Sequence, residues 1–124
     1  MNKIPPSELA VMKVIWNSEE ALSSRQVIDI LEQEKGWKRT TILTLLSRLL
    51  DRNFLSAEKI KRYTYYTPLV NKYDYIKLET KVFFENIHEN SLDSLISALY
   101  DNNDLCKSDL KKIEECIKKE VQLI

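Results

Sequence analysis

Apolar side chains recur at helical spacing in three segments of the first half of the chain. The first predicts a helix over about 7–16, directly after two prolines. The second predicts a helix over about 24–34, because Ser23 and Gln26 form the capping-box pattern of a hydroxyl followed three residues later by Gln. The third predicts a helix over about 39–52. The pattern therefore indicates three helices in succession.

The third of these helices has one continuous apolar face. At 100° per residue its apolar side chains fall within about 140° of one another. The opposite face carries hydroxyl groups, and Asn53 follows where a residue able to adopt the left-handed conformation would end the helix. We expect the apolar face to pack into a core, and it consists of Ile42, Leu45, Leu46, Leu49 and Leu50.

Two short segments after the third helix have strand character. Residues 54–59 form the first, and residues 62–67 are rich in aromatic and β-branched side chains. Ile60 and Lys61 lie between them as a basic hairpin tip, and Pro68 closes the second strand. The tip lacks the Gly or Asn that a two-residue turn prefers. The sequence therefore predicts a hairpin without defining the geometry of its turn.

The remainder of the chain is expected to be helical, over 71–88, 91–100 and 107–122. The last two segments each carry an apolar stripe. Short amphipathic helices can hardly bury such stripes by themselves, so a second copy of the chain is their natural cover. We therefore expect a homodimer that pairs through Leu92, Leu95, Ile96, Leu99, Leu110, Ile113, Ile117 and Val121.

The formal net charge of zero conceals an uneven distribution of charge. Residues 35–62 contain eight basic and two acidic side chains, a local net charge of +6. A basic segment of this kind can attract phosphate even in a neutral protein. By itself it is more often a solvated face, so it gains weight only from its structural context.

The composition argues against an enzyme and against a metal site. The single glycine excludes a Gly-rich phosphate loop, and the single histidine excludes a conventional zinc finger. That histidine, His88, lies among polar residues and is expected at the surface. Cys106 and Cys116 stand ten residues apart without a CxxC pattern, which is typical of two reduced thiols. We expect no catalytic residues, no cofactor and no metal.

The hydropathy pattern also bears on the compartment. No apolar run approaches the roughly 18 residues that span a bilayer, and the first six residues lack the apolar core of a secretory signal. Apolar residues make up 44% of the chain and charged residues 31%. We therefore expect a folded, soluble, cytoplasmic protein without membrane insertion.

The expected order of three helices and a β-hairpin is that of a winged helix-turn-helix, with Gly36 in the turn. The predicted fold class is mainly α with a small β-hairpin, divided into a winged-helix DNA-binding domain at 1–70 and a helical dimerisation domain at 71–124. The third helix would enter the major groove of double-stranded DNA, and the wing would contact phosphates. The candidate DNA-binding residues are Lys38, Arg39, Thr40, Thr41, Leu43, Thr44, Ser47, Arg48, Lys59, Lys61, Arg62 and Tyr63.

Leu43 is the exception among these candidates, because it is a bulky apolar side chain on the flank of a polar face. Packing at the edge of the helix would explain it. Contact with thymine methyl groups in the major groove would explain it equally well. The sequence leaves both explanations open.

The chain resembles the penicillinase repressor family of BlaI/MecI type. The resemblance covers essentially the whole chain, and its matching stretches are Glu8–Trp16, Trp37–Leu49, Arg62–Pro68 and Asp74–Ile76. It implies a homodimer that binds a short inverted repeat and represses transcription, controlling β-lactam resistance genes.

The resemblance also implies how repression ends. In this family a membrane-bound sensor of β-lactams signals proteolysis of the repressor in its tail, and the dimer falls apart. The equivalent bond here joins Ala98 and Leu99, where well-known members have Asn-Phe. The third helix departs from the family as well, since Thr40 stands where members usually carry Lys.

Two other functions remain alternatives. A winged helix can serve as a protein-interaction module that never contacts DNA, since a fold does not fix a function. That class would more often show an apolar patch on the exposed face of the third helix. The second alternative is a metal-responsive repressor using Cys106 and Cys116, although copper-responsive relatives carry clustered CxC pairs that this chain lacks.

Overall fold

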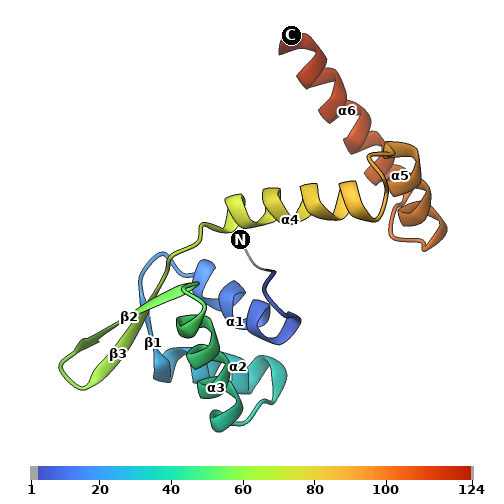
Figure 1. Ribbon diagram of the computed structural model, residues 1–124. Helices are drawn as coiled ribbons and strands as arrows, with labels where there is room; N and C mark the ends of the chain where they lie inside the picture. The colour runs from blue at the N-terminus through green and yellow to red at the C-terminus, as the bar shows by residue number, and fades with distance from the viewer. Residues whose placement is uncertain (1–2, 124) are drawn as a thin grey trace. The chain divides into compact units, whose positions relative to one another are not determined.

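The structure, a computed structural model, describes residues 3–123 (Figure 1). It divides into two compact units, Met1–Glu79 and Thr80–Ile124. Along the chain the elements are α1 (Pro6–Trp16), β1 (Leu22–Ser23), α2 (Ser24–Lys35), α3 (Arg39–Asp51), β2 (Leu55–Ile60), β3 (Tyr63–Pro68), α4 (Lys72–Asn86), α5 (Leu92–Asp101) and α6 (Lys107–Leu123). All six predicted helices and both predicted strands are therefore present.

The core of the first unit lies between its three helices and the sheet. The third helix contributes as the periodicity predicts, since four of its five apolar-face residues are buried and Leu50 is partly buried. Burial of these side chains removes apolar surface from water and supplies the main driving force for folding. The buried apolar residues are Ile4, Val11, Met12, Ile15, Val27, Ile28, Leu31, Ile42, Leu45, Leu46, Leu49, Phe54, Leu55, Tyr66 and Tyr75.

The sheet has three antiparallel strands in the order β1-β3-β2. The two-residue strand β1 was not predicted; it pairs Leu22 with Tyr66 on β3. The hairpin of β2 and β3 ends with the pair Ile60 and Tyr63, so its turn lies one residue later than predicted. Lys61 takes the first position of that turn with a φ of 59°. The hairpin projects from the helices as a wing (Figure 1).

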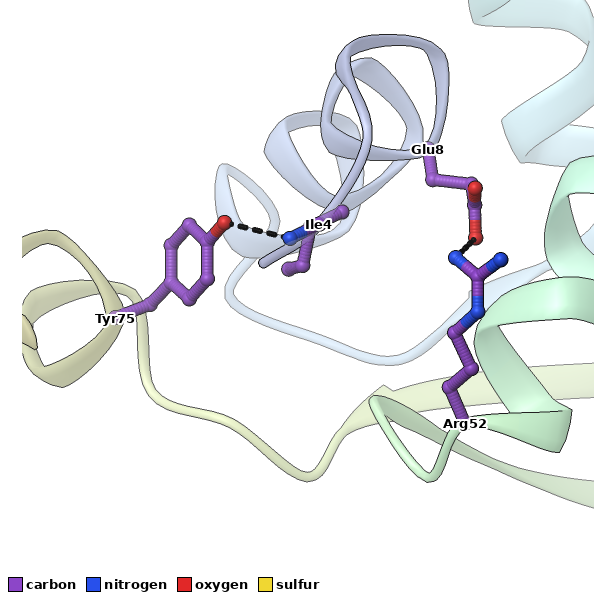
Figure 2. Close-up of polar contacts among 4 residues, drawn as sticks. All are labelled: Ile4, Glu8, Arg52 and Tyr75. Carbon is purple, nitrogen blue, oxygen red and sulfur yellow. Dashed lines mark hydrogen bonds and ion pairs between the residues drawn. The ribbon is translucent and has the colours of Figure 1, made fainter. Parts of the chain in front are cut away.

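Two polar contacts tie distant parts of the first unit together (Figure 2). The guanidinium of Arg52, at the end of α3, donates to the buried carboxylate of Glu8 on α1 at 2.7 Å. The backbone N–H of Ile4 donates to the hydroxyl of Tyr75 on α4 at 2.8 Å. The tyrosine ring also lies 5.8 Å from the ring of Trp16. The beginning of α4 therefore belongs to the first unit, beyond the predicted domain boundary at residue 70.

The second unit contains the remainder of α4 together with α5 and α6. The prediction that His88 lies at the surface is wrong, because its exposed fraction is 8%. Its Nδ1 lies 2.8 Å from the hydroxyl of Ser94, and its ring meets the ring of Phe83 edge-on at 5.0 Å. The hydroxyl of Ser94 thus gives the buried imidazole a hydrogen-bond partner at Nδ1, and Phe83 packs against its ring.

Candidate nucleic-acid interface

The turn between α2 and α3 fixes the direction of the exposed third helix. Gly36 ends α2 in the left-handed conformation, with φ 67° and ψ 20°, and its N–H donates to the carbonyl of Glu32 at 3.0 Å. Lys38 then adopts an extended conformation before the first turn of α3. At the start of α2, Ser23 and Gln26 form the predicted capping box. Both ends of α2 are thus set by local sequence signals.

All the candidate residues on α3 lie at the surface of the first unit. Thr44 donates its hydroxyl to the carbonyl of Thr40 at 2.9 Å, which leaves its oxygen as an acceptor. Leu43 is 37% exposed, enough for its side chain to reach a ligand. Thr40, Thr44 and Arg48 border one shallow depression on this helix. The exposed candidates are Lys38, Arg39, Thr40, Thr41, Leu43, Thr44, Ser47 and Arg48.

The wing carries the remaining candidates, Lys59, Lys61, Arg62 and Tyr63, all exposed. Ile60 joins them at the tip with 48% of its surface exposed, and sequence reasoning did not single it out. The sequence placed Ile60 in the hairpin tip, where the basic neighbour Lys61 carried the signal for DNA binding.

The basic candidates form no ion pair with the described residues of the chain. Within the described residues only two ion pairs occur, Arg52 with Glu8 and Lys118 with Glu114. Arg52 was not a candidate. It is the basic residue of the 35–62 segment whose side chain pairs with an acidic residue of the same chain. The basic groups of α3 and the wing remain available to an external anion.

Sequence reasoning missed one further basic residue, Arg25 in the first turn of α2. Arg25, Arg39 and Arg62 border a common groove between α2, α3 and β3. The capping pattern around Arg25 indicates a helix start and gives no signal for anion binding. The groove itself depends on the tertiary arrangement, so no local pattern could have revealed it.

In the second unit, the predicted dimerisation residues are all exposed or partly exposed. Leu92, Ile117 and Val121 are the most exposed, and α5 contains no buried residue. The others, Leu95, Ile96, Leu99, Leu110 and Ile113, are less exposed.

The two cysteines are exposed free thiols. Hydrogen bonds from the backbone N–H and the thiol of Cys106 lower the pKa of Asp109, whose carboxylate lies 3.2 Å from the sulfur. Across residues 3–123, no group of three His, Cys, Asp or Glu side chains is arranged to hold a metal ion. Nor does this part of the chain contain a helix with the length and apolar character to cross a membrane.

A helix-turn-helix whose exposed second helix is flanked by a basic hairpin defines a winged-helix protein of the DNA-binding class. The chain belongs to the penicillinase repressor family, whose model matches residues 4–119. Members of this family are DNA-binding repressors, not enzymes. The family, the winged-helix fold class and the absence of enzymatic function predicted from the sequence are thus confirmed.

Curated relatives match nearly the full chain. The penicillinase repressor of Bacillus licheniformis is 30% identical over 120 residues, covering 94% of this chain and 93% of the relative. The methicillin resistance regulatory protein MecI of Staphylococcus aureus (strain N315) is 26% identical over 117 residues, with 94% of each chain covered.

Solved structures resemble the winged-helix part. The DNA-binding domain of the repressor BlaI, solved in solution, matches with a TM-score of 0.54 and 38% identity, covering 61% of this chain and 95% of that domain. The monomeric form of Bacillus licheniformis BlaI in complex with the blaP half-operator matches with a TM-score of 0.53 and 37% identity, covering 60% and 90%.

Proposed function

We propose that this repressor binds a palindromic operator as a homodimer, with α3 of each copy in the major groove and the wing on the phosphate backbone. The observation that carries the proposal is the exposed α3 face, whose hydroxyl groups and unpaired basic side chains adjoin a basic wing. Hydroxyl groups and arginine can bind base edges or phosphates, and lysines can bind phosphates. The likeness to BlaI bound to a half-operator supports this placement.

Dimerisation is supported by the apolar stripes of α5 and α6. In the single chain these stripes remain accessible to water, including Leu92 at 57% and Val121 at 63% exposure. A second copy would cover them and remove apolar surface from water. Two linked winged helices then bind two half-sites with a high effective concentration for the second contact.

The genes that this repressor regulates are those of β-lactam resistance. The repressor acts in the cytoplasm, where the operator lies. The names of the penicillinase repressor and the methicillin resistance regulator support this part of the proposal. Release would follow when a membrane sensor protease system triggers cleavage between Ala98 and Leu99. Both residues are partly buried within α5, so α5 must open locally before a protease can bind them in extended form.

The test is fluorescence anisotropy of the purified full-length protein with the DNA upstream of its own gene and of adjacent resistance genes. A random duplex serves as the control, at two salt concentrations. We expect nanomolar binding and a preference of about 10³-fold or more for one upstream duplex. Weak, equal binding to all duplexes that is lost at higher salt would contradict the proposal. That result would instead favour the protein-interaction module. The metal-responsive alternative predicts DNA binding that changes when metal is added.

A further inference from the structure

We propose that the groove between α2, α3 and β3 seats a phosphate of the DNA backbone, and that Arg25 is a contact to it. The inference rests on the proposed DNA binding and extends that surface to a third element. Three arginines border the groove: Arg25 from α2, Arg39 from α3 and Arg62 from the turn before β3. Tyr63 and Thr64 add hydroxyl groups to its wall.

The arginines of this groove have no acidic partner within the described part of the chain. Acidic side chains are nevertheless close by, because Asp29 and Glu32 border the same groove from later turns of α2. Asp29 follows Arg25 at the i+4 spacing that permits a helical ion pair, yet none forms. Three exposed guanidinium groups that border one groove without forming an ion pair there are suited to bind an external anion.

The two acidic groups also restrict where a phosphate can lie. Along the axis of α2, Asp29 and Glu32 are about 6 Å and about 10 Å beyond Arg25. Repulsion from these carboxylates disfavours an anion at that end of the groove. A phosphate is therefore favoured at the beginning of α2, where Arg25 borders the groove and where the pairing of Ser23 with Tyr65 brings β3 alongside.

The helix starts around the groove have the same electrostatic character. Neither α2 nor α3 has an acidic residue in its first turn, whereas α1, α4, α5 and α6 each have one. An acidic side chain in the first turn normally stabilises the positive end of the helix dipole. At α2 and α3 an arginine stands there instead, so a bound phosphate would supply the missing negative charge.

The groove is continuous with the proposed DNA surface, and this favours DNA as the source of the phosphate. Arg39 and Arg62 border the groove and belong to the candidate residues of α3 and the wing. A duplex that occupies α3 and the wing would bring its backbone to the groove between them. Contacts of this kind set register and affinity without reading the sequence.

The test compares full-length wild type, Arg25→Ala and Arg25→Lys for binding to a random duplex over a series of salt concentrations. Lys13→Ala is the matched control, because it removes one exposed basic side chain from α1 of the same unit. For Arg25→Ala we expect the slope of log K against log salt to become shallower by about 0.9, the value for one phosphate. Arg25→Lys should retain most of the slope, and Lys13→Ala all of it.

A slope for Arg25→Ala equal to that of wild type would overturn the inference, as would an equal change in Lys13→Ala. Failure of the proposed function has a different signature, because wild type would then show no preference among upstream duplexes. Absence of any DNA binding by wild type would overturn both. The thermal unfolding midpoint of each variant verifies folding, and Arg25 is exposed, so we expect no shift.

Discussion

The contact between Glu8 and Arg52 has unequal consequences for its two partners. The side chain of Glu8 is 3% exposed, whereas that of Arg52 is 42% exposed. An isolated arginine could therefore be hydrated, but an isolated Glu8 carboxylate could not. A buried charge without a partner is far more costly than a hydrated one.

We expect Arg52→Ala to lower the free energy of unfolding by about 2–3 kcal/mol, because it leaves the Glu8 carboxylate without a partner. Glu8→Gln should cost about 1 kcal/mol or less, since the amide oxygen can still accept from Arg52. Urea unfolding monitored by circular dichroism gives both values. Equal losses of unfolding free energy in the two variants would show that the cost of Arg52→Ala does not come from an unpaired Glu8 carboxylate.

Tyr75 is a second residue whose environment carries a prediction. Its hydroxyl is the acceptor for the buried N–H of Ile4. Tyr75→Phe retains the ring beside Trp16 but leaves that N–H without its acceptor, so we expect a loss of about 1–3 kcal/mol in the free energy of unfolding. Tyr73→Phe, at an exposed position on the same helix, is the control and should change little.

The same residue predicts an alkaline dependence of stability. Burial raises the pKa of Tyr75 above its ordinary value, and burial also raises the pKa of Tyr66. A raised pKa in the folded state means that the stabilising contribution is complete below about pH 10. It is lost as the pH rises through the raised pKa. Tyr75→Phe should therefore lose stability less steeply than wild type above pH 10, and parallel curves would contradict this.

Among the secondary-structure elements, α3 and the wing would have different roles in the proposed DNA complex, α3 in specificity and the wing in affinity. Leu43 and Thr44 lie on the exposed face of α3 with Arg48 beside them, and Arg62 lies on the wing. In the proposed complex, Leu43 and Thr44 contact base edges, and Arg48 and Arg62 contact phosphates. Substitutions in the two groups should therefore have different signatures.

We expect Leu43→Ala and Thr44→Ala to reduce the preference for operator over random duplex, by about 1–3 kcal/mol for each lost base contact. Arg48→Ala and Arg62→Ala should weaken binding to both duplexes and make the salt slope shallower by about 0.9 each. Anisotropy titrations at several salt concentrations measure both effects. Equal losses on both duplexes for Leu43→Ala would favour its packing explanation.

The elements that the sequence predicted are those with a local signal. Helical periodicity and the Ser23–Gln26 capping box located α1, α2 and α3 to within one residue at each end. The strand β1 has two residues and no periodicity, and its existence depends on pairing with Tyr66. The burial of His88 likewise depends on Phe83 and Ser94, which come together only when the chain folds.

The candidate site also has one part that local sequence patterns predict and another part that depends on the tertiary structure. The exposed face of α3 could be deduced from periodicity because its opposite face is the core. The position of Arg25 beside Arg39 and Arg62 could not be deduced, since these neighbours come from α3 and from the turn before β3. Arg52 could not be separated from the other basic residues either, because its partner Glu8 lies 44 residues earlier.

For the molecule as a whole, the extent of the first unit predicts which fragment folds. Tyr75 and Val70 lie near the predicted boundary, and the carbonyl of Val70 accepts from the indole of Trp16 at 2.8 Å. A fragment of residues 1–79 retains Tyr75, whereas a fragment of residues 1–70 loses it. We expect the longer fragment to be more stable by about 2–4 kcal/mol in urea unfolding. Equal stabilities would show that Tyr75 is peripheral to the core.

The proposed homodimer gives the second prediction at this scale. Leu92→Asp places a charge on the apolar stripe of α5 at a position that is 57% exposed in the single chain. We expect the molar mass from light scattering to fall from dimer to monomer, because the charge would be buried at the interface. Ser97→Asp, on the opposite side of the same helix, is the control and should remain dimeric. A dimeric Leu92→Asp would exclude this stripe from the interface.

Gly36 has a consequence for how this protein can vary over evolution. No atom lies within 4 Å of the position that a Cβ would occupy, so the site restricts the backbone angle and not the volume of the side chain. Asn53, Asn90 and Asn103 already adopt positive φ elsewhere in the chain. Asparagine tolerates that conformation better than other non-glycine residues, whereas alanine would cost about 1 kcal/mol. The turn of the helix-turn-helix can therefore drift between glycine and asparagine, and related repressors need not share a glycine there.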